Sequence, residues 1–411
     1  MTLVKPFRAL RPRPEHAADV VAPPYDVVDT DEARALARGK PYSFLHVSRP
    51  EIDLPEDTDP YSDRVYAQGA ANLERLVVNG VLVRDDAPSF YVYRMRVADH
   101  VQTGVACVAS VRAYEENRIR KHELTRPDKE TDRVRNIDAL NAQTGPVLCA
   151  YRGNEKLRAL LADAARGAPL LDVDGPQDVR HTIWRVADPT AVARLERELD
   201  ALGRLYIADG HHRSAAAARI AQARRKGIAA SPDASHEYFL TVAFPHDEMR
   251  ILAYNRVVAD LNGMTPQAFI ERVGSVFDVT PARAAVVPDA PGTFGLYVGG
   301  RWYELHLPRE ALPDDPVERL DVSLLQDRIN APLLGIDDPR TNPRIAFVGG
   351  IRGVLELERL VDGGRAAAAF SLHPTTMEQL MAVADAERLM PPKSTWFEPK
   401  LADGLLSHVL D

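Results

Sequence analysis

The sequence predicts a mixed α/β (α+β) protein with a smaller α+β module toward its C-terminal end. The 411 residues are 45% hydrophobic and 27% charged, an ordinary globular composition in a chain long enough for two or three domains. Strand-like and helix-like apolar patterns alternate up to about residue 254, and shorter elements follow. We therefore expect a mixed α/β domain over 1–254, a smaller module over 255–370, and a C-terminal segment over 371–411 that docks back onto the functional site.

Apolar spacing and the positions of Gly and Pro define the elements of the first domain. The first 60 residues are rich in Pro and Asp, and Pro23, Pro24 and Pro50 are expected to break any regular element there. Strands over 89–97 and 104–114 are predicted to form a hairpin across 99–102. The remaining predicted elements are helices over 62–79, from about 128, and over 154–165, 189–202 and 211–226, with strands over 181–186, 204–208 and 238–244.

The smaller module is predicted from helices over 266–273 and 321–330 and from short strands over 293–298, over 302–307, and near 344 and 366. The tail over 390–400 contains too many prolines for a regular element. It also contains Trp396 and Phe397, so we expect it to be ordered by packing.

Composition also bears on partners and location. The net charge is −8 and no basic tail is present, so nucleic-acid binding is not expected. No apolar run approaches the roughly 18 residues of a membrane helix, and the first residues lack a signal peptide's apolar core. The two cysteines, Cys107 and Cys149, fit a reducing compartment. These features predict a cytoplasmic protein without a membrane partner.

The strongest functional pattern is Asp209-Gly210-His211-His212-Arg213, at the junction of a predicted strand and a predicted helix. The first N–H groups of a helix are unpaired and carry partial positive charge, so they bind anions. Gly210 lets a ligand approach the backbone, and Arg213 adds a guanidinium suited to phosphate. The pattern predicts a phosphate site, with Asp209 and His211 as catalytic groups and Gly210, His212 and Arg213 as phosphate ligands. The structural alternative is an N-cap followed by two surface histidines.

A second polar segment runs from Arg120 to Arg133 and follows a predicted strand. Its latter half is explained by a salt-bridged helix start capped by Asp128. Lys121, His122 and Glu123 precede that helix on a loop, where functional residues often lie. We expect Lys121 and His122 to bind phosphate and Glu123 to act as a general base or an Mg²⁺ ligand. The sequence leaves the metal ligands otherwise unassigned.

Two weaker patterns extend the predicted site. Only eight of the 51 basic residues are lysines, and four of these lie in two polar segments, Lys121 with Lys129 and Lys393 with Lys400. Lys393, Ser394 and Thr395 are predicted to hold a phosphate, with an irregular packed strap as the alternative. Near the N-terminus, Pro23 and Pro24 would hold Tyr25 and Asp26 rigidly; these two and Arg133 are predicted substrate contacts, with a simple turn as the alternative.

Common catalytic patterns are missing from the sequence. It has no Walker-type phosphate loop, GxGxxG fingerprint, nucleophile elbow or HExxH, since Arg126 stands where the second His of the last would be. Classical P-loop kinases, Rossmann dehydrogenases, α/β-hydrolases and zincins are therefore disfavoured.

Four ordered motifs carry a resemblance to a known family. They are Ala22-Pro23-Pro24-Tyr25-Asp26-Val27; His122-Glu123-Leu124-Thr125 with Asp132-Arg133; Ile207 to Arg213; and Met390 to Phe397. Together they resemble the bacterial and archaeal family known as domain of unknown function 1015, from Phe7 to about His408. The Asp-Gly-His-His-Arg block also looks like the nucleotide-binding turn of the ParB/sulfiredoxin fold, whose members include free-serine kinases.

This resemblance implies a ParB/sulfiredoxin-like core with ADP or ATP as co-substrate, Mg²⁺ as the companion of the phosphoryl group, and residues 209–213 at the nucleotide. The leading hypothesis is a nucleotide-dependent phosphotransferase acting on a small hydroxylated metabolite, with free L-serine the best single candidate. The alternatives are a metal-dependent phosphohydrolase and a non-catalytic nucleotide-binding module. The sequence does not identify the acceptor, the nucleotide or the oligomeric state.

Overall fold

The computed structural model describes residues 2–226 and 231–411 and has the predicted mixed α/β class. The chain forms two compact units, Met1–Met249 with Pro399–Asp411, and Arg250–Glu398. Residues 371–398, grouped with the tail in the sequence analysis, belong to the second unit, and residues 399–411 belong to the first. No helix in the described residues is long and apolar enough to span a bilayer.

The strands of the first unit are β1 (Val4–Lys5), β2 (Ala9–Pro12), β3 (Leu82–Arg84), β4 (Phe90–Val97), β5 (His100–Ser110), β6 (Ile119–Arg120), β7 (Ala142–Gln143), β8 (Val147–Tyr151), β9 (Leu171–Asp174), β10 (Arg180–Val186), β11 (Leu205–Asp209), β12 (Tyr238–Pro245) and β21 (Ser407–Val409). Its α-helices are α1 (Ala17–Val20), α2 (Thr30–Ala37), α3 (Leu45–Ser48), α4 (Asp63–Val78), α5 (Val111–Glu115), α6 (Pro127–Leu140), α7 (Glu155–Ala164), α8 (Pro189–Asp200) and α9 (His211–Arg225).

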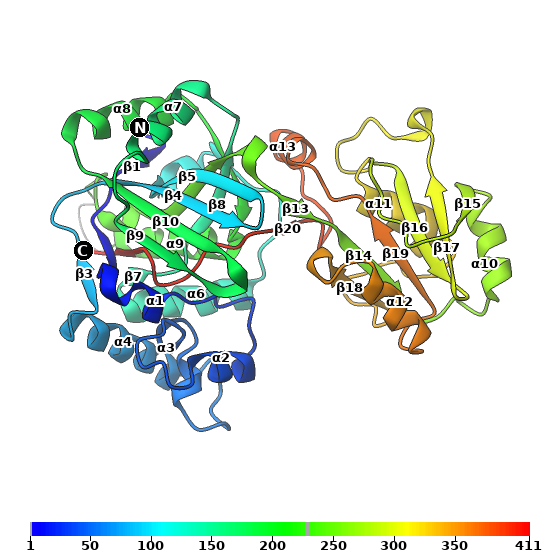
Figure 1. Cartoon of the computed structure of the whole chain (residues 1–411), viewed down its shortest axis with the longest axis horizontal. Coiled ribbons are helices and arrows are strands. Elements are labelled where there is room, and N and C mark those ends of the chain that lie inside the picture. Colours follow the sequence, from blue (N-terminus) through cyan, green and yellow to red (C-terminus); the bar gives the residue numbers. More distant parts are fainter. Residues whose placement is uncertain (1, 227–230) are drawn as a thin grey trace. The chain divides into compact units, whose positions relative to one another are not determined.

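A nine-stranded sheet in the order β6-β11-β8-β12-β5-β4-β10-β9, with β1 beside β5, is the centre of the first unit (Figure 1). Apolar side chains of its strands pack against apolar side chains of α5, α7, α8 and α9, and together they form one hydrophobic cluster. Helix α9 is rich in alanine, so its backbone comes close to its neighbours, and eight of its fifteen residues are buried. This helix therefore lies within the unit, packed against β8, β12 and α6.

A second, four-stranded sheet in the order β3-β2-β21-β7 joins the two ends of the chain. Ala9 and Leu10 of β2 pair with His408 and Ser407 of β21, and β21 also pairs with β7. A further bridge joins Ala22 to Asp403. The last thirteen residues are thus built into the first unit by backbone hydrogen bonds.

The second unit has a six-stranded antiparallel sheet in the order β15-β17-β16-β19-β14-β18. The strands of this unit, in the sheet and outside it, are β13 (Ile251–Leu252), β14 (Tyr254–Val258), β15 (Asp278–Ala282), β16 (Thr293–Val298), β17 (Arg301–His306), β18 (Ile345–Gly349), β19 (Ala368–Leu372) and β20 (Trp396–Phe397). Its α-helices are α10 (Pro266–Val273), α11 (Asp321–Leu325), α12 (Leu355–Asp362) and α13 (Met377–Asp385). Leu357 of α12 packs on the sheet in a separate core.

Several local predictions need correction. The hairpin turn is tighter than predicted, since β5 already begins at His100, and residues 111–115 form α5 because Ser110 caps a helix there. Helix α2 lies in the segment expected to be irregular, and the side chains of Asp29 and Glu32 form a capping box at its start. The predicted helix over 321–330 ends as an α-helix at Leu325 and continues as a π-helical turn.

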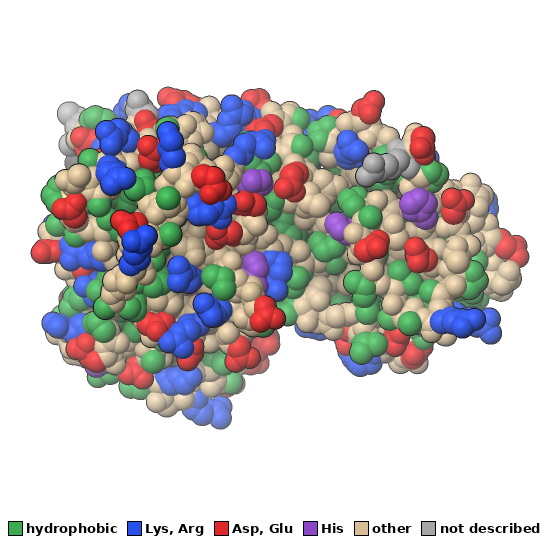
Figure 2. All heavy atoms as spheres, turned by 45° about the horizontal axis from the view of Figure 1, so that its top comes forward, with side chains coloured by type: hydrophobic (Ala, Val, Ile, Leu, Met, Phe, Trp, Pro, Cys, Tyr) green, Lys and Arg blue, Asp and Glu red, His purple; other side chains and the backbone are tan. Residues whose placement is uncertain are grey.

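Charged side chains of both signs cover the surface. Figure 2 shows basic and acidic side chains intermixed on the face that it draws. The mixture of signs agrees with the modest net charge of −8.

We predict that Gly104→Ala destabilises the central sheet by about 3 kcal/mol, the upper part of the range for overpacking a core. A methyl group at Gly104 would overlap the carbonyl oxygen of Ala243 and lie 2.7 Å from Cδ1 of Phe244. Urea unfolding followed by circular dichroism measures the loss. Gly167→Ala is the matched control, because its Cβ would meet no heavy atom within 4 Å. Equal stability of the two variants would contradict the prediction.

The buried His181 predicts acid sensitivity. Burial lowers the pKa of His181 to about 3, so the native state binds fewer protons than the unfolded state below pH 6.5. Stability from this residue is present above pH 6.5 and is lost as the pH falls, by about 2 kcal/mol between pH 7 and pH 5. In His181→Gln the difference in unfolding free energy between these two pH values shrinks by that amount. The exposed His306→Gln serves as control, and an unchanged difference in His181→Gln would refute this assignment.

Candidate functional site

The polar segments that follow β6 and β11 meet at one edge of the central sheet. Strands β6 and β11 are parallel neighbours, with Ile119 opposite Leu205 and Arg120 opposite Tyr206. Their carboxyl ends therefore point the same way, which places His122 and Glu123 beside the start of α9. Two motifs about 90 residues apart in the sequence are thus brought together.

The start of α9 is open to a ligand. Gly210, the N-cap residue, has φ of 101° in the left-handed region, and the helix start receives no side-chain cap. A Cβ atom at Gly210 would lie 3.0 Å from Nε and 3.1 Å from Cζ of Arg213. Glycine is thus needed both for the backbone conformation and because the Arg213 guanidinium fills the space where a side chain would be.

Lys400 from the C-terminal segment completes this edge, although the sequence analysis gave it no site role. Its Nζ atom donates to Oδ2 of Asp209 at 2.9 Å, and Nη2 of Arg213 lies 3.7 Å from Oδ1 of the same carboxylate. The side chains of Lys400 and Arg213 are 17% and 10% exposed. Two cations that face solvent only in part thus hold one carboxylate at the helix start.

The predicted substrate contacts, Tyr25, Asp26 and Arg133, lie near Arg213. Oδ2 of Asp26 lies 3.9 Å from Nη2 of Arg213, and the Arg133 guanidinium stacks on the ring of Tyr25 at 3.9 Å. Asp403, a second residue without a predicted role, accepts a hydrogen bond from the backbone N–H of Tyr25 at 3.2 Å. The structure therefore brings Tyr25, Asp26 and Arg133 to the edge that holds Asp209.

A small cavity of about 30 Å³ lies beside Tyr25, Arg133, Arg213 and Asp403. That volume has room for one or two water molecules. The cavity itself is too small for an amino acid, so a substrate at this edge would bind on the solvent side of Asp26 and Glu123, whose side chains are 40% and 49% exposed.

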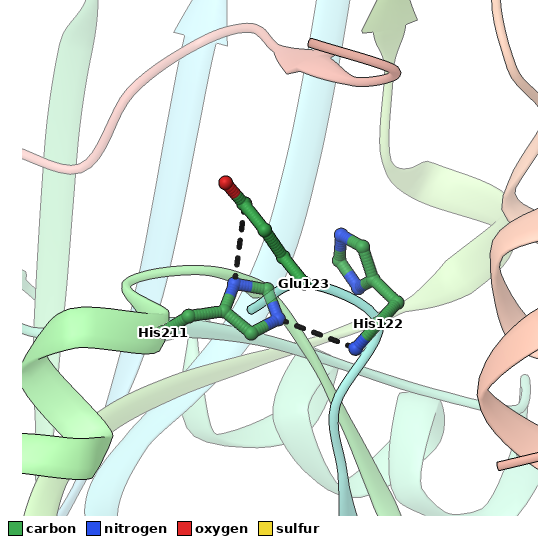
Figure 3. Close-up of side chains that lie close together, drawn as sticks. All are labelled: His122, Glu123 and His211. Atoms are coloured by element: carbon green, nitrogen blue, oxygen red, sulfur yellow. Dashed lines mark hydrogen bonds and ion pairs between the residues drawn. The ribbon is translucent and has the colours of Figure 1, made fainter. Parts of the chain in front are cut away.

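His122, Glu123 and His211 form a compact group on the other side of Gly210 (Figure 3). Oε2 of Glu123 lies 3.7 Å from Nδ1 of His211. The backbone N–H of His122 donates to Nε2 of His211 at 3.4 Å, so the proton of a neutral His211 ring resides on Nδ1 and faces Glu123.

The charges of the site follow from these contacts. Burial would raise the pKa of Asp209, but Lys400 and Arg213 hold it well below its usual value. Burial lowers the pKa of His122 to about 4. Burial also holds the pKa of His211 well below its usual value, and repulsion between the two rings when both are protonated adds to this effect. Burial also raises the pKa of Asp403 to about 7. At neutral pH the site therefore combines an ionised Asp209 with two neutral imidazoles.

The remaining predicted residues make other contacts. The Lys121 ammonium sits over the ring of Tyr114 at 4.4 Å, and Nε2 of His212 accepts the backbone N–H of Arg126 at 3.0 Å. Lys393, Ser394 and Thr395 belong to the second unit. There the Ser394 hydroxyl donates to the Pro391 carbonyl at 2.6 Å.

Comparison with known proteins gives the family. The model of the family described as "Protein of unknown function (DUF1015)" matches residues 4–323. The chain belongs to this family. Family membership, inferred above from the motifs, is thereby confirmed, although the match ends before the Met390–Phe397 motif. No curated protein matches this DUF1015 chain.

Solved structures similar to this DUF1015 protein are 12–14% identical to it in sequence. C-terminally truncated SbnI from Staphylococcus aureus is 12% identical over 72% of this chain and 85% of its own, with a TM-score of 0.38. A free serine kinase in complex with AMP is 13% identical over 71% and 86%, with a TM-score of 0.34. A conserved hypothetical protein from Pyrococcus furiosus is 14% identical over 76% and 97%, with a TM-score of 0.34. Function must therefore be argued from the site itself.

We predict that Lys400→Met lowers the free energy of unfolding by about 2 kcal/mol, because Asp209 then lacks its nearest cation in a partly buried position. Asp209→Asn has a similar effect. The double variant loses less than the sum of the two, since each single change removes the same ion pair. Urea unfolding at pH 7 measures all three, with the exposed Lys156→Met as control. Strictly additive losses would show that the pair contributes nothing.

Proposed function

We propose that this DUF1015 protein is a cytoplasmic, nucleotide-dependent phosphotransferase acting on a small hydroxylated metabolite, with free L-serine the leading candidate acceptor. The observation that carries the proposal is the uncapped start of α9, flanked by the cations Lys400 and Arg213 and by the exposed carboxylate of Glu123. The resemblance of residues 209–213 to a nucleotide-binding turn supports ADP or ATP as the phosphoryl donor.

Phosphoryl transfer requires positioning and charge neutralisation more than covalent chemistry. The first N–H groups of α9 would hold the phosphate oxygens of the donor. Lys400 would neutralise charge on the transferred group, and Asp209 would position Lys400 rather than accept a proton, because its own pKa is held low. Glu123 would accept the proton of the acceptor hydroxyl, oriented by the Nδ1–H of His211.

The expected Mg²⁺ fits this edge only in part. Mg²⁺ prefers six oxygen ligands and usually reaches a protein through one or two carboxylates and substrate phosphates. Here the Asp209 carboxylate is held by Lys400, and Glu123 lies beside an imidazole. Mg²⁺ would therefore arrive with the nucleotide, and the proton transfer to Glu123 is independent of it.

Two alternatives make different use of the same groups. A phosphohydrolase would activate water in place of the acceptor hydroxyl, and a binding module would hold the nucleotide without turnover. The exposed Glu123, beside His211 at the start of α9, favours an enzyme, because a binding module has no need of a base beside the phosphate.

The test is transfer of labelled phosphate from ADP or ATP, with Mg²⁺, to a panel of free amino acids and small alcohols. We predict phosphorylated serine as a product. Glu123→Gln should lower kcat about 100-fold or more, the range for loss of a general base, while nucleotide affinity changes by less than about threefold.

The exposed Glu116→Gln provides the same substitution away from the edge and should retain full activity. Release of free phosphate alone would assign the protein as a hydrolase. Nucleotide binding without turnover in the unaltered protein would assign it as a binding module.

A further inference from the structure

The group of His122, Glu123 and His211 has the composition and spacing of a metal site. One possible ligand atom from each residue lies within 4.8 Å of the others, the one such group of three or more found among residues 2–226 and 231–411. His122 and His211 are 2% and 4% exposed, whereas the Glu123 side chain is 49% exposed. The group is therefore buried on its imidazole side and open on its carboxylate side.

The backbone holds these residues in place. His122 and Glu123 directly follow Lys121 after β6, and His211 is the first residue of α9 after β11, the parallel neighbour of β6. The parallel pairing of β6 with β11 joins the two segments, and in the metal-free protein the backbone N–H of His122 also donates to His211. A site built on the ends of two paired strands is preformed, so a ligand would meet little ordering entropy.

His122 provides an independent sign that a ligand belongs here. Both of its ring nitrogens are buried, and neither has a hydrogen-bond partner among residues 2–226 and 231–411. Burying polar atoms without a partner is costly in free energy, and buried unpaired groups are rare in native proteins. The Ile207 carbonyl lies beside the ring and could receive the N–H of one nitrogen once the other is bound to a ligand, the usual outer-shell arrangement of metal-bound histidines.

The donor atoms indicate the class of ion. Nδ1 of His211 and Oε2 of Glu123 are 3.7 Å apart, close to the roughly 3.4 Å that separates two ligands of a tetrahedral ion with bonds near 2.1 Å. Two imidazoles and one carboxylate suit Zn²⁺, Mn²⁺, Fe²⁺ or Co²⁺, whereas Mg²⁺ prefers oxygen ligands. Three protein ligands also leave coordination positions for water or a substrate oxygen.

We propose that His122, Glu123 and His211 bind a divalent first-row transition-metal ion whose open positions face the exposed side of Glu123. Binding through Nδ1 of His211 transfers the ring proton to Nε2 and releases the long hydrogen bond from His122. The remaining approach of the ligand atoms comes from rotation of the exposed Glu123 side chain. The ion needs no nucleotide to bind, so metal binding is tested separately from phosphotransfer. With the ion bound, Glu123 would be a ligand, and Nδ1 of His211 would no longer orient it as a general base.

The experiment uses the full chain, treated with chelator and then dialysed against Zn²⁺, Mn²⁺ or Mg²⁺ alone, without nucleotide. Metal analysis is expected to show one equivalent of Zn²⁺ or Mn²⁺ per chain, with Mg²⁺ bound about 100-fold more weakly. Co²⁺ bound at the same site should give visible absorption that Zn²⁺ abolishes. Absence of bound Zn²⁺ and Mn²⁺ would overturn the proposal.

Variants locate the ion. His122→Ala, Glu123→Gln and His211→Ala should each weaken Zn²⁺ binding about 100-fold, since each removes one of three ligands. Because a buried histidine variant can fail to fold, the exposed Glu123→Gln is decisive, and Zn²⁺ should raise the melting temperature of the unaltered protein but not of this variant. His212→Ala is the matched control, because its ring contacts Arg126 instead. Equal loss of Zn²⁺ binding in His212→Ala, or full retention in Glu123→Gln, would overturn the assignment.

Discussion

The arrangement of the first unit depends on the ion pair between Lys400 and Asp209. The N-terminal end of α9 and two partly buried cations place much positive charge at one edge of the sheet, and Asp209, Asp26 and Asp403 balance it. A buried charge is tolerated only beside its partner. The C-terminal segment must therefore return to this edge, and the pairing of β21 with β2 and β7 fixes its path.

The same constraint explains the composition of the strand-turn-helix motif. Arg213 reaches back over Gly210, the N-cap of its own helix, so position 210 has no room for a side chain, and its positive φ also favours glycine. The alanines that follow let α9 approach both the sheet and α6. Close packing and an open helix start are thus met by one short segment, whose N-cap glycine has no side chain that could cap the helix.

The local elements of this site could be predicted from sequence, and its long-range partners could not. Strand β11 is a short apolar run and helix α9 is an alanine-rich segment that begins right after Asp209 and Gly210, and each predicted bound differs from the observed one by at most one residue. Lys400 is 191 residues from Asp209, and only the sheet topology brings them together; its one signal was a lysine retained in an arginine-rich chain. Helix α2 was missed because Pro23, Pro24 and Pro50 led us to expect no regular element in this region, although the helix itself contains no proline and begins with a capping box.

The two halves of the edge are joined by the rigid turn at Gly210, with Asp209 and Lys400 on one side and His211 on the other. A cation bound by His122, Glu123 and His211 would add positive charge beside cations that already favour an anion. A phosphate on the α9 amides would in turn reduce the repulsion that such a cation meets. Because coupling between two ligands is reciprocal, each would strengthen the other by the same factor. The neutral imidazoles and the charged cluster therefore form one electrostatic unit, in which a metal ion and a phosphate would occupy adjacent places.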